Sequence, residues 1–379
     1  MVIPTCDCSG ASIRLPLAHS GLDAVSPRWQ YQGMAWALPK YSRDEVDAAG
    51  RTLIDPRHTY ELVRALDVID NWRSSHSFPL NTFQIGLRDR ARQVGGRGVV
   101  AQRLKRISSI AAKLRRFRDL TLSEMQDIGG CRAVVSSVAR VDQLVQSYRD
   151  SGVKHVECDA DDYIRTPKPS GYRGVHLIYS YHSDKKETYN GLKVEVQIRS
   201  PQQHAWATAV ETVDIFTSQA LKSGGGAQDW RRFFKLMGTD MALRERTAPV
   251  PGTPTSRGPL RDEIRHHVNT LDVERRLMLF GSTLRDRPKF FGKDVDYFLL
   301  ELEMDTEPPQ VTVFGYRRTE LELANDHYIA TERKHEGRKA DAVLVSVASI
   351  AALRRAYPNY FLDTSIFLDT VKRAVGSDT

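Results

Sequence analysis

The middle of the chain contains four short strand-like runs with a single helical pattern between the first two. In the last run, Val194, Val196 and Ile198 fall on one side of an extended strand, and Glu195 and Gln197 fall on the other. Such an alternation is typical of a strand with one buried face, and the polar face is either a solvated surface or the floor of a site. The runs are CRAVVSS, VKHVECD, GVHLIYSYH and KVEVQIRS, and the helical pattern is VARVDQLVQSYRDSG.

Helical patterns flank this strand-rich region. Ser42 followed by Glu45 forms a capping box, which predicts a helix start, and apolar residues at helical spacing continue to about Trp72. The basic segment VVAQRLKRISSIAAKLRRF (99–117) is predicted as one helix, and PQQHAWATAVETVDIF and AQDWRRFFKLMGTDMALRE return to helix. The fold class predicted for this part is therefore α+β, with helices packed on a sheet.

A segment rich in Pro and Gly, TAPVPGTPTSRGPL, ends this first half and is predicted to be a linker or long loop. Beyond it we expect one helix, the strands DYFLLELEM, QVTVFGYRR and DAVLVSV, and two short helices broken at Pro358. This pattern predicts a smaller α/β domain. The predicted divisions are an N-terminal extension at 1–40, a main domain at 41–246, a linker at 247–261 and a C-terminal domain at 262–379.

The charge balance favours anionic partners. The chain has 379 residues and a formal net charge of +8, which fits nucleotides or RNA. No run of about 18 apolar residues occurs, and the N-terminus lacks the apolar core of a signal peptide, so we expect a cytoplasmic protein with no membrane partner. Its four cysteines suit a reducing compartment.

Three short patterns could carry chemistry. In the basic segment, Lys105, Ser109 and Lys113 step by four on the expected helix, with Arg103 further round it. Such a face fits a triphosphate, although a solvated or RNA-binding basic face would have the same composition.

A carboxylate precedes the first strand of the central region in MQDIGGCR. If Asp127 converges with Glu195 from a neighbouring strand, the two supply hard oxygen ligands that suit Mg²⁺. An isolated Asp before a strand is also a common turn residue, so both interpretations stand at this point.

The loop DYIRTPKPSGYRGVH contains two Pro and two Gly residues that exclude regular structure ahead of the next strand. Lys168, Tyr172 and Arg173 lie on this loop, and His176 follows them. An aromatic ring beside cations can stack on a base while the cations hold phosphates. Packing of Tyr172 against the protein is the alternative.

Taken together and in this order, these motifs resemble the synthetase domain of the RelA/SpoT family. The resemblance spans about Tyr41 to Phe216 and rests on R-x-K-x(3)-S-x(3)-K, Asp127-x(4)-Arg132, PKPSGYRGVH and VEVQIRS. It implies a mixed-sheet nucleotidyltransferase fold that transfers pyrophosphate from ATP to a ribose 3′-hydroxyl.

The resemblance also implies a role for each matching residue. Asp127 and Glu195 would be the catalytic pair, with Asp127 holding Mg²⁺ and Glu195 positioning the acceptor hydroxyl or sharing the metal. Tyr172 would stack on the acceptor base. ATP would contact Arg103, Lys105, Ser109, Lys113 and Arg132, and the acceptor would contact Lys168, Arg173, His176, Gln197 and Arg199.

Two further features bear on the subgroup: a departure from the family pattern and an additional motif. Family members usually carry Asn where this loop has Ser170, which leaves the acceptor open. Tyr357-Pro358-Asn359-Tyr360 matches the Tyr-x-x-Tyr motif that blocks the ATP site in fused, capsid-sensing toxin–antitoxin members (CapRel-like proteins). Two tyrosines packing a small core are the ordinary alternative.

The sequence therefore predicts a fused toxin–antitoxin of the toxic subgroup (toxSAS), acting in anti-phage defence. It would pyrophosphorylate the 3′-terminal adenosine of tRNA and stay inhibited by its own C-terminal domain until a phage protein, such as a major capsid protein, binds. Two alternatives stand beside it: an alarmone synthetase using GDP, GTP or an adenine nucleotide, and an RNA-binding module without activity. The oligomeric state stays open.

Overall fold

The structure is a computed structural model of the whole chain. It describes residues 36–55, 57, 61–95, 99–152, 154–220, 227–282, 295–303, 305–306, 310–335, 338, 340–346 and 364–376. Among these residues, no helix combines the length and apolar character that a membrane span requires. The expected N-terminal extension at 1–40 lies almost entirely outside the described residues.

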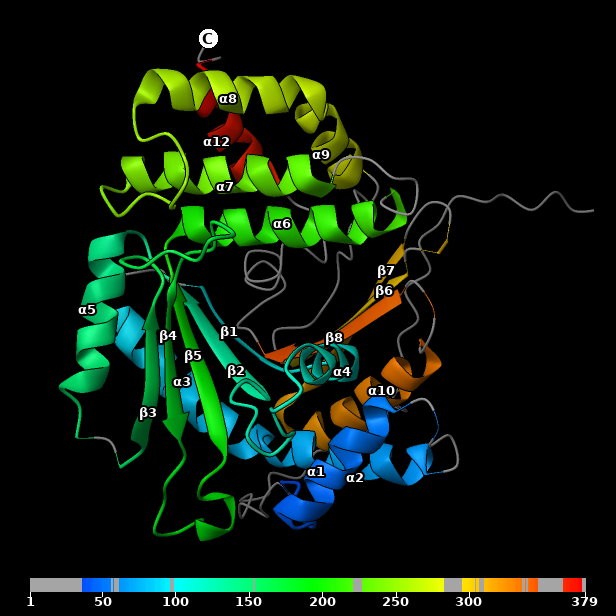
Figure 1. The fold of residues 1–379 in the computed structure, drawn as a ribbon. Helices are drawn as coiled ribbons and strands as arrows, with labels where there is room; N and C mark the ends of the chain where they lie inside the picture. The colour runs from blue at the N-terminus through cyan, green and yellow to red at the C-terminus, as the bar shows by residue number, and fades with distance from the viewer. Residues whose placement is uncertain are drawn as a thin grey trace, which may run out of the picture.

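One eight-stranded mixed sheet organises the molecule, in the order β3-β4-β5-β2-β1-β8-β6-β7 (Figure 1). The pair β2–β5 is parallel and the other pairs are antiparallel. Its first five strands are β1 (Val99–Leu104), β2 (Gly129–Val134), β3 (Val156–Asp162), β4 (Val175–Ser180) and β5 (Lys193–Arg199). The predicted α+β class with a mixed sheet and flanking helices is confirmed, as are the four central strands.

The alternation in β5 separates core from site as predicted. Val194, Val196 and Ile198 are fully buried in the main hydrophobic core. This core lies between the sheet and the helices α3 (Ser77–Gln93) and α5 (Val138–Arg149), which cover one face. The other face of β5 presents Glu195 and Gln197, so burying one face leaves the opposite one for polar side chains.

The predicted continuous helix over 99–117 is wrong in its first half. Val99–Leu104 forms β1, and only Ile107–Arg116 forms a helix, α4. Strand β1 hydrogen-bonds with β2 on one side and β8 on the other. These long-range pairings override the local helical pattern, because tertiary context decides the structure of a short ambiguous segment.

The N-terminal helices begin as predicted and extend further. Helix α1 (Arg43–Ile54) has the capping box, in which the Ser42 hydroxyl accepts from the Glu45 amide and the Glu45 carboxylate accepts from the Ser42 amide. Helix α2 (Leu62–Ser75) follows, and α3 continues the helical region beyond Trp72.

A second core lies in a layer of helices on one side of the sheet (Figure 1). The layer comprises α6 (Pro201–Ala220), α7 (Ala227–Arg244), α8 (Arg257–Thr270), α9 (Val273–Ser282) and the C-terminal α12 (Ser365–Val375). The expected single helix after Leu260 is two helices, because the chain turns at Asp272, which has a positive φ of 49°. The loop before α8 is packed rather than loose, since Val250 is buried.

The C-terminal strands extend the same sheet. They are β6 (Val295–Glu303), β7 (Gln310–Arg317) and β8 (Ala340–Ser346), and α10 (Leu321–Lys334) packs against them. Strand β8 pairs with β1 through Gln102 opposite Ser346 and Arg103 opposite Val345. The segment 262–379 therefore shares a sheet with the main domain, and its independence as a regulatory unit remains a prediction.

Candidate active site

A polar cavity of about 280 Å³ opens on the sheet face opposite α3. The strand register builds its floor from two rows of residues that lie side by side across the strands. Gly130, which has no side chain, lies between Arg103 and Glu195. The first row is Arg103, Gly130, Glu195 and Ile178, and the second is Ala101, Arg132, Gln197 and His176.

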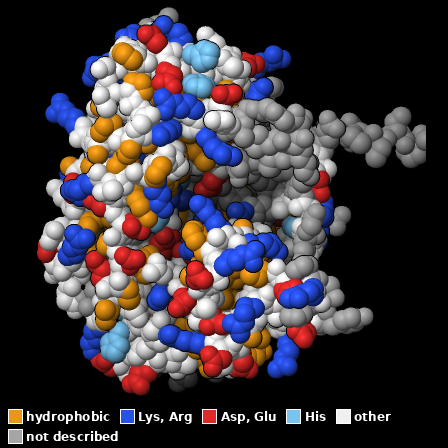
Figure 2. Space-filling model, viewed as in Figure 1, with side chains coloured by type: hydrophobic (Ala, Val, Ile, Leu, Met, Phe, Trp, Pro, Cys, Tyr) orange, Lys and Arg blue, Asp and Glu red, His pale blue; other side chains and the backbone are white. Residues whose placement is uncertain are grey.

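Charged side chains dominate this cavity. Cations come from β1, α4, β2 and the loop before β4, and carboxylates come from the segment before β2, from β5 and from β3. Figure 2 shows Lys and Arg side chains gathered around a hollow near the middle of this face, with acidic atoms deeper in it. The cations that line the cavity are Arg103, Lys105, Lys113, Arg132 and Lys168, and the carboxylates are Asp127, Asp161 and Glu195.

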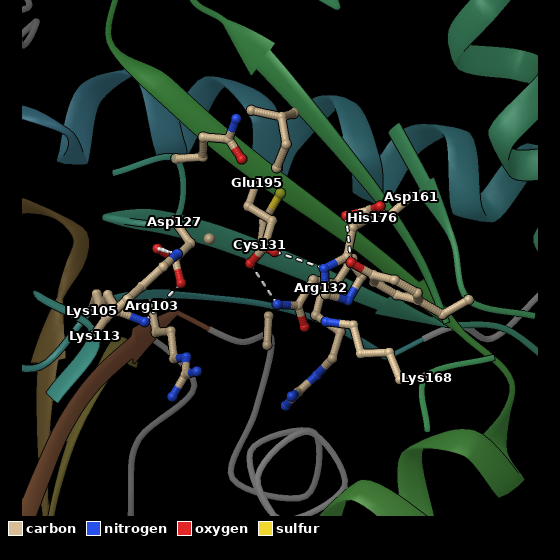
Figure 3. A pocket seen from close by; sticks show the side chains of 16 residues that line it. Arg103, Lys105, Lys113, Asp127, Cys131, Arg132, Asp161, Lys168, His176 and Glu195 are labelled. Carbon is tan, nitrogen blue, oxygen red and sulfur yellow. Dashed lines mark hydrogen bonds and ion pairs between the residues drawn. The ribbon is translucent and has the colours of Figure 1, made fainter. Parts of the chain in front are cut away.

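Asp127 is held between two lysines at one end of the cavity. Its Oδ2 accepts from Lys105 Nζ at 2.7 Å and its Oδ1 accepts from Lys113 Nζ at 2.9 Å (Figure 3). Lys105 directly follows β1 and Lys113 lies on α4, so the turn between strand and helix brings the two ammonium groups together. The spacing that predicted one helical face therefore works through a strand–turn–helix instead.

Glu195 is the end point of a closed ring of hydrogen bonds. His176 Nδ1 lies 2.8 Å from Glu195 Oε1, and Gln197 Nε2 donates to Glu195 Oε2 at 2.6 Å. His176 Nε2 lies 2.5 Å from the Tyr172 hydroxyl. Arg199 Nη2 closes the ring, donating to the Tyr172 hydroxyl and to the side-chain oxygen Oε1 of Gln197 at 2.7 Å each.

The carboxylate fixes the direction of the hydrogen bonds that end on it. Because an ionised carboxylate only accepts, His176 donates the proton on its Nδ1 to Glu195. Burial alone would raise the pKa of Glu195, but hydrogen bonding and the charge of His176, with Gln197, outweigh it and lower the pKa to about 2. Glu195 is therefore an oriented anion at neutral pH.

The loop before β4 forms the other end of the cavity. Lys168 Nζ lies 4.0 Å from the centre of the Tyr163 ring and 5.5 Å from that of Tyr172, and Arg199 lies 5.0 Å from the Tyr172 ring. Gly171 and Gly174 adopt φ values of 97° and 149°, which allow the loop to turn back onto β4. A cation with neighbouring aromatic rings suits a phosphorylated, base-containing ligand.

Four predicted site residues lie outside the cavity lining that the described residues form. Ser109 lies on α4, one turn before Lys113. Tyr172 and Arg199 lie behind His176 and Gln197, in the ring, and Tyr172 packs edge-on against Trp206. These two support residues that line the cavity.

Arg173, the fourth, points away from the cavity. Its guanidinium donates to the carbonyl oxygens of Ile164 at 2.8 Å and Ala248 at 2.7 Å, and to the Thr247 hydroxyl at 2.5 Å. Only 3% of Arg173 is exposed. The expected phosphate contact is therefore replaced by a structural role, which fastens the loop after α7 to the loop after β3.

Tyr357 and Tyr360, the expected autoinhibitory pair, lie outside the described residues. The cavity also contains residues that sequence reasoning missed, namely Gln126, Asp161 and Tyr163. Tyr163 donates to Asp161 at 2.5 Å. The only signal for Asp161 is its place in VECDADD, whose acidic character looks like that of an exposed edge strand.

The carboxylates fit a magnesium ion in donor type. Asp127 and Glu195 face one cavity and offer hard oxygens, the ligands that Mg²⁺ prefers. The cations beside them are suited to the phosphates that would accompany the metal. The predicted convergence of Asp127 and Glu195 on one cavity is thus observed.

The five cations that line this cavity suit the phosphate groups of a ligand. Residues 102–215 match a family model described as a region found in RelA / SpoT proteins. This match supports the family resemblance for this segment of the chain.

Relatives support the same family. The chain is 33% identical over 114 residues to the GTP pyrophosphokinase YwaC of Bacillus subtilis (strain 168), covering 28% of this chain and 52% of that protein. It is 35% identical over 112 residues to the GTP pyrophosphokinase YjbM of the same strain, covering 29% and 52%. The chain thus spans about half the length of these curated relatives.

Among solved structures, the chain is similar to the small alarmone synthetase 2 from Bacillus subtilis. The TM-score is 0.40 at 22% identity, covering 47% of this chain and 94% of that one. The toxic subgroup and the fused organisation remain predictions.

Proposed function

We propose that this chain is an ATP-dependent pyrophosphokinase of RelA/SpoT type. The observation that carries the proposal is the single cavity in which a lysine pair on Asp127 faces the hydrogen-bonded Glu195. The RelA/SpoT match and the relatives named GTP pyrophosphokinase support the same reaction class.

The two ends of the cavity divide the substrates between them. Lys105 and Lys113 hold the ATP phosphates, together with Arg103 and Arg132. These four cations offer several charged donors to the phosphate oxygens at one end of the cavity. The acceptor lies at the Lys168 end. Glu195 stands between the two sets, where the reacting hydroxyl would lie.

In the proposed reaction, the acceptor hydroxyl oxygen forms a bond to the β-phosphorus of ATP. The bond from that phosphorus to the oxygen bridging it to the α-phosphate breaks, and AMP leaves. Glu195 accepts a hydrogen bond from the attacking hydroxyl and orients it. The hydroxyl proton is released to water as the new bond forms, and the cations stabilise charge on the phosphates. A phosphoryl-type transfer of this kind depends mainly on positioning and electrostatics.

Asp127 and Glu195 are the residues that would hold Mg²⁺. When bound, the ion would neutralise charge on the transferred phosphates. Asp127 already interacts with two cations, so the lysines move from carboxylate to phosphate as the substrate enters.

We propose the 3′-terminal adenosine of tRNA as the acceptor, in a fused toxin–antitoxin of anti-phage defence. The Tyr357–Tyr360 motif supports this subgroup, and Ser170 in place of the usual Asn leaves room for an acceptor other than a free nucleotide. The exposed Arg116, one helical turn after the cavity residue Lys113, extends the cationic surface as a polyanion would require. The C-terminal segment would inhibit the enzyme until a phage protein binds.

An alarmone synthetase that uses GDP or GTP is the second candidate. It is favoured by relatives named GTP pyrophosphokinase. In both cases the donor and the roles of Asp127 and Glu195 are the same, so only the acceptor distinguishes the two.

One labelling experiment tests these proposals. The Tyr357→Ala/Tyr360→Ala protein is incubated with γ-³²P-ATP and either deacylated tRNA or GDP and GTP, with Glu195→Gln as control. Label on tRNA that requires Glu195 supports the toxin. Label on the guanine nucleotide supports the alarmone synthetase, and label on neither acceptor contradicts both.

A further inference from the structure

A buried arginine lies directly behind the lysine pair of the cavity. Arg73, on α2, is 1% exposed, and its Nε donates to the backbone carbonyl of Lys105 at 2.9 Å. Its other nitrogens reach Asp70 at 2.8 Å, Glu332 at 2.7 Å and the Tyr328 hydroxyl at 2.9 Å. Two of these partners, Tyr328 and Glu332, lie on α10, in the C-terminal part of the chain.

Glu332 makes a second contact, with the start of the helix that carries the other lysine. Its Oε1 accepts from the backbone N–H of Ile107 at 3.3 Å, at the first residue of α4. The N-cap of α4, Arg106, makes no side-chain capping bond. A carboxylate at this position satisfies an N–H group that the helix leaves free and interacts favourably with the helix dipole.

The charges in this cluster are tightly matched. Burial alone would lower the pKa of Arg73, but Glu332, Tyr328 and Asp70 outweigh it and raise the pKa. Without Glu332, the buried guanidinium would lose its ion pair with α10 and keep only the hydrogen bond to Tyr328 there, and the first turn of α4 would lose its capping carboxylate. Removing one partner of a buried pair costs far more than removing an exposed one.

Lys105 and Lys113 are the two residues that this cluster places. Arg73 fixes the backbone of Lys105, and Glu332 fixes the start of the helix that carries Lys113. Both ammonium groups then converge on Asp127 (Figure 3). The geometry of the proposed phosphate-binding end thus depends on a helix far away in sequence.

We propose that Arg73 and Glu332 are positioning residues for the ATP end of the cavity, and that docking of α10 sets the affinity for ATP. This inference rests on the proposed function. In this inference the C-terminal segment supports ATP binding, because its helix α10 holds the backbone that carries the two lysines.

The test compares Glu332→Gln with Lys334→Gln in the full-length Tyr357→Ala/Tyr360→Ala protein. Lys334 is a matched control, because it lies on the same helix and its ion pair with Glu301, at 2.8 Å, stays within the C-terminal part. Steady-state kinetics give KM for ATP and kcat, and calorimetry gives the Kd of a non-hydrolysable ATP analogue.

We expect Glu332→Gln to raise both KM for ATP and the analogue Kd by about tenfold, which corresponds to about 1.4 kcal/mol. KM for the acceptor and the parameters of Lys334→Gln should match the parent. Unchanged ATP parameters, with only a lower melting temperature, would overturn the inference and leave a purely structural pair.

Tyr328→Phe keeps the test decisive if Glu332→Gln fails to fold. It removes one hydrogen bond from Arg73, and we expect a smaller rise of KM for ATP in the same direction. An unchanged KM in this variant would also overturn the inference. A parent protein that binds no ATP analogue would instead refute the proposed function.

Discussion

His176 Nδ1 lies 2.8 Å from Glu195 Oε1. This contact is part of a ring of hydrogen bonds that joins Arg199 and Glu195, a cation and an anion on the same strand, β5. Arg199 donates along two arms, one through Tyr172 and His176 and the other through Gln197, and both arms end on Glu195. The ring orients Glu195 and keeps it ionised. In the proposed reaction, Glu195 therefore acts as an anion that holds the acceptor hydroxyl in place, and it does not keep the proton of that hydroxyl.

The two arms predict coupled variants. Tyr172→Phe removes the hydroxyl from one arm, and we expect kcat to fall about tenfold, since a hydrogen bond in a charged network contributes about 1.5 kcal/mol. Gln197→Leu should have a similar effect through the other arm. The double variant should lose more than the product of the two, because each arm alone still orients Glu195. Simple additivity in steady-state kinetics would contradict the ring.

Asp127→Asn separates nucleotide binding from turnover. The change removes the anion shared by Lys105 and Lys113, so both ammonium groups become available to phosphates. We expect transfer to fall more than about 100-fold, while ATP without metal binds at least as tightly as to the unchanged protein. Calorimetry in EDTA measures the affinity. Asp161→Asn is the control, because its carboxylate lines the cavity without contacting these lysines.

The pattern of polar and apolar residues was enough to predict β5 and its two faces. The run Val194, Val196 and Ile198 needs no partner to be recognised, because strand alternation is local. The loop with Lys168 was equally clear from its Pro and Gly residues. Site residues on these elements could therefore be found from sequence, once their order was matched to a family.

Long-range pairing explains what the sequence could not show. Val99–Leu104 is a strand because β2 and β8 lie beside it, and β8 is more than 230 residues away along the chain. The position of Glu332 behind Lys105 has the same origin. The composition of a loop does not reveal which of its cations points into a site. Lys168 therefore lines the cavity, whereas Arg173 is buried against the protein.

Arg173 should behave as a structural residue. Arg173→Gln removes a buried guanidinium from three oxygen acceptors, and we expect a loss of about 3 kcal/mol in the free energy of unfolding. Urea denaturation measures this. At a temperature where the variant is folded, KM for the acceptor should be unchanged. Lys168→Gln is the matched comparison and should lose acceptor affinity while keeping its stability.

The basic surface after Lys113 gives a test of the acceptor. Arg116 is exposed one helical turn after Lys113, and we expect Arg116→Gln to raise KM for tRNA about threefold while KM for ATP stays the same. The salt dependence of tRNA binding should become shallower by about one phosphate contact. An equal loss with tRNA and with GDP would contradict a tRNA-specific surface.

His76 makes the stability of the fold depend on pH. It is 1% exposed, its Nδ1 donates to the Trp72 carbonyl at 2.7 Å, and burial lowers its pKa from 6.5 to about 4. Between these values the unfolded chain binds the proton and the folded chain does not, so stability falls as the pH drops from about 6.5 to about 4.

The full shift corresponds to about 3 kcal/mol, at about 1.4 kcal/mol for each pKa unit. Urea denaturation at pH 7, 6 and 5 measures the slope for the unchanged protein and for His76→Gln. The variant should be less stable at pH 7 and show a flatter dependence, because its side chain does not titrate. Other buried histidines contribute equally to both proteins, so equal slopes would mean that His76 is protonated at its site or exposed to solvent.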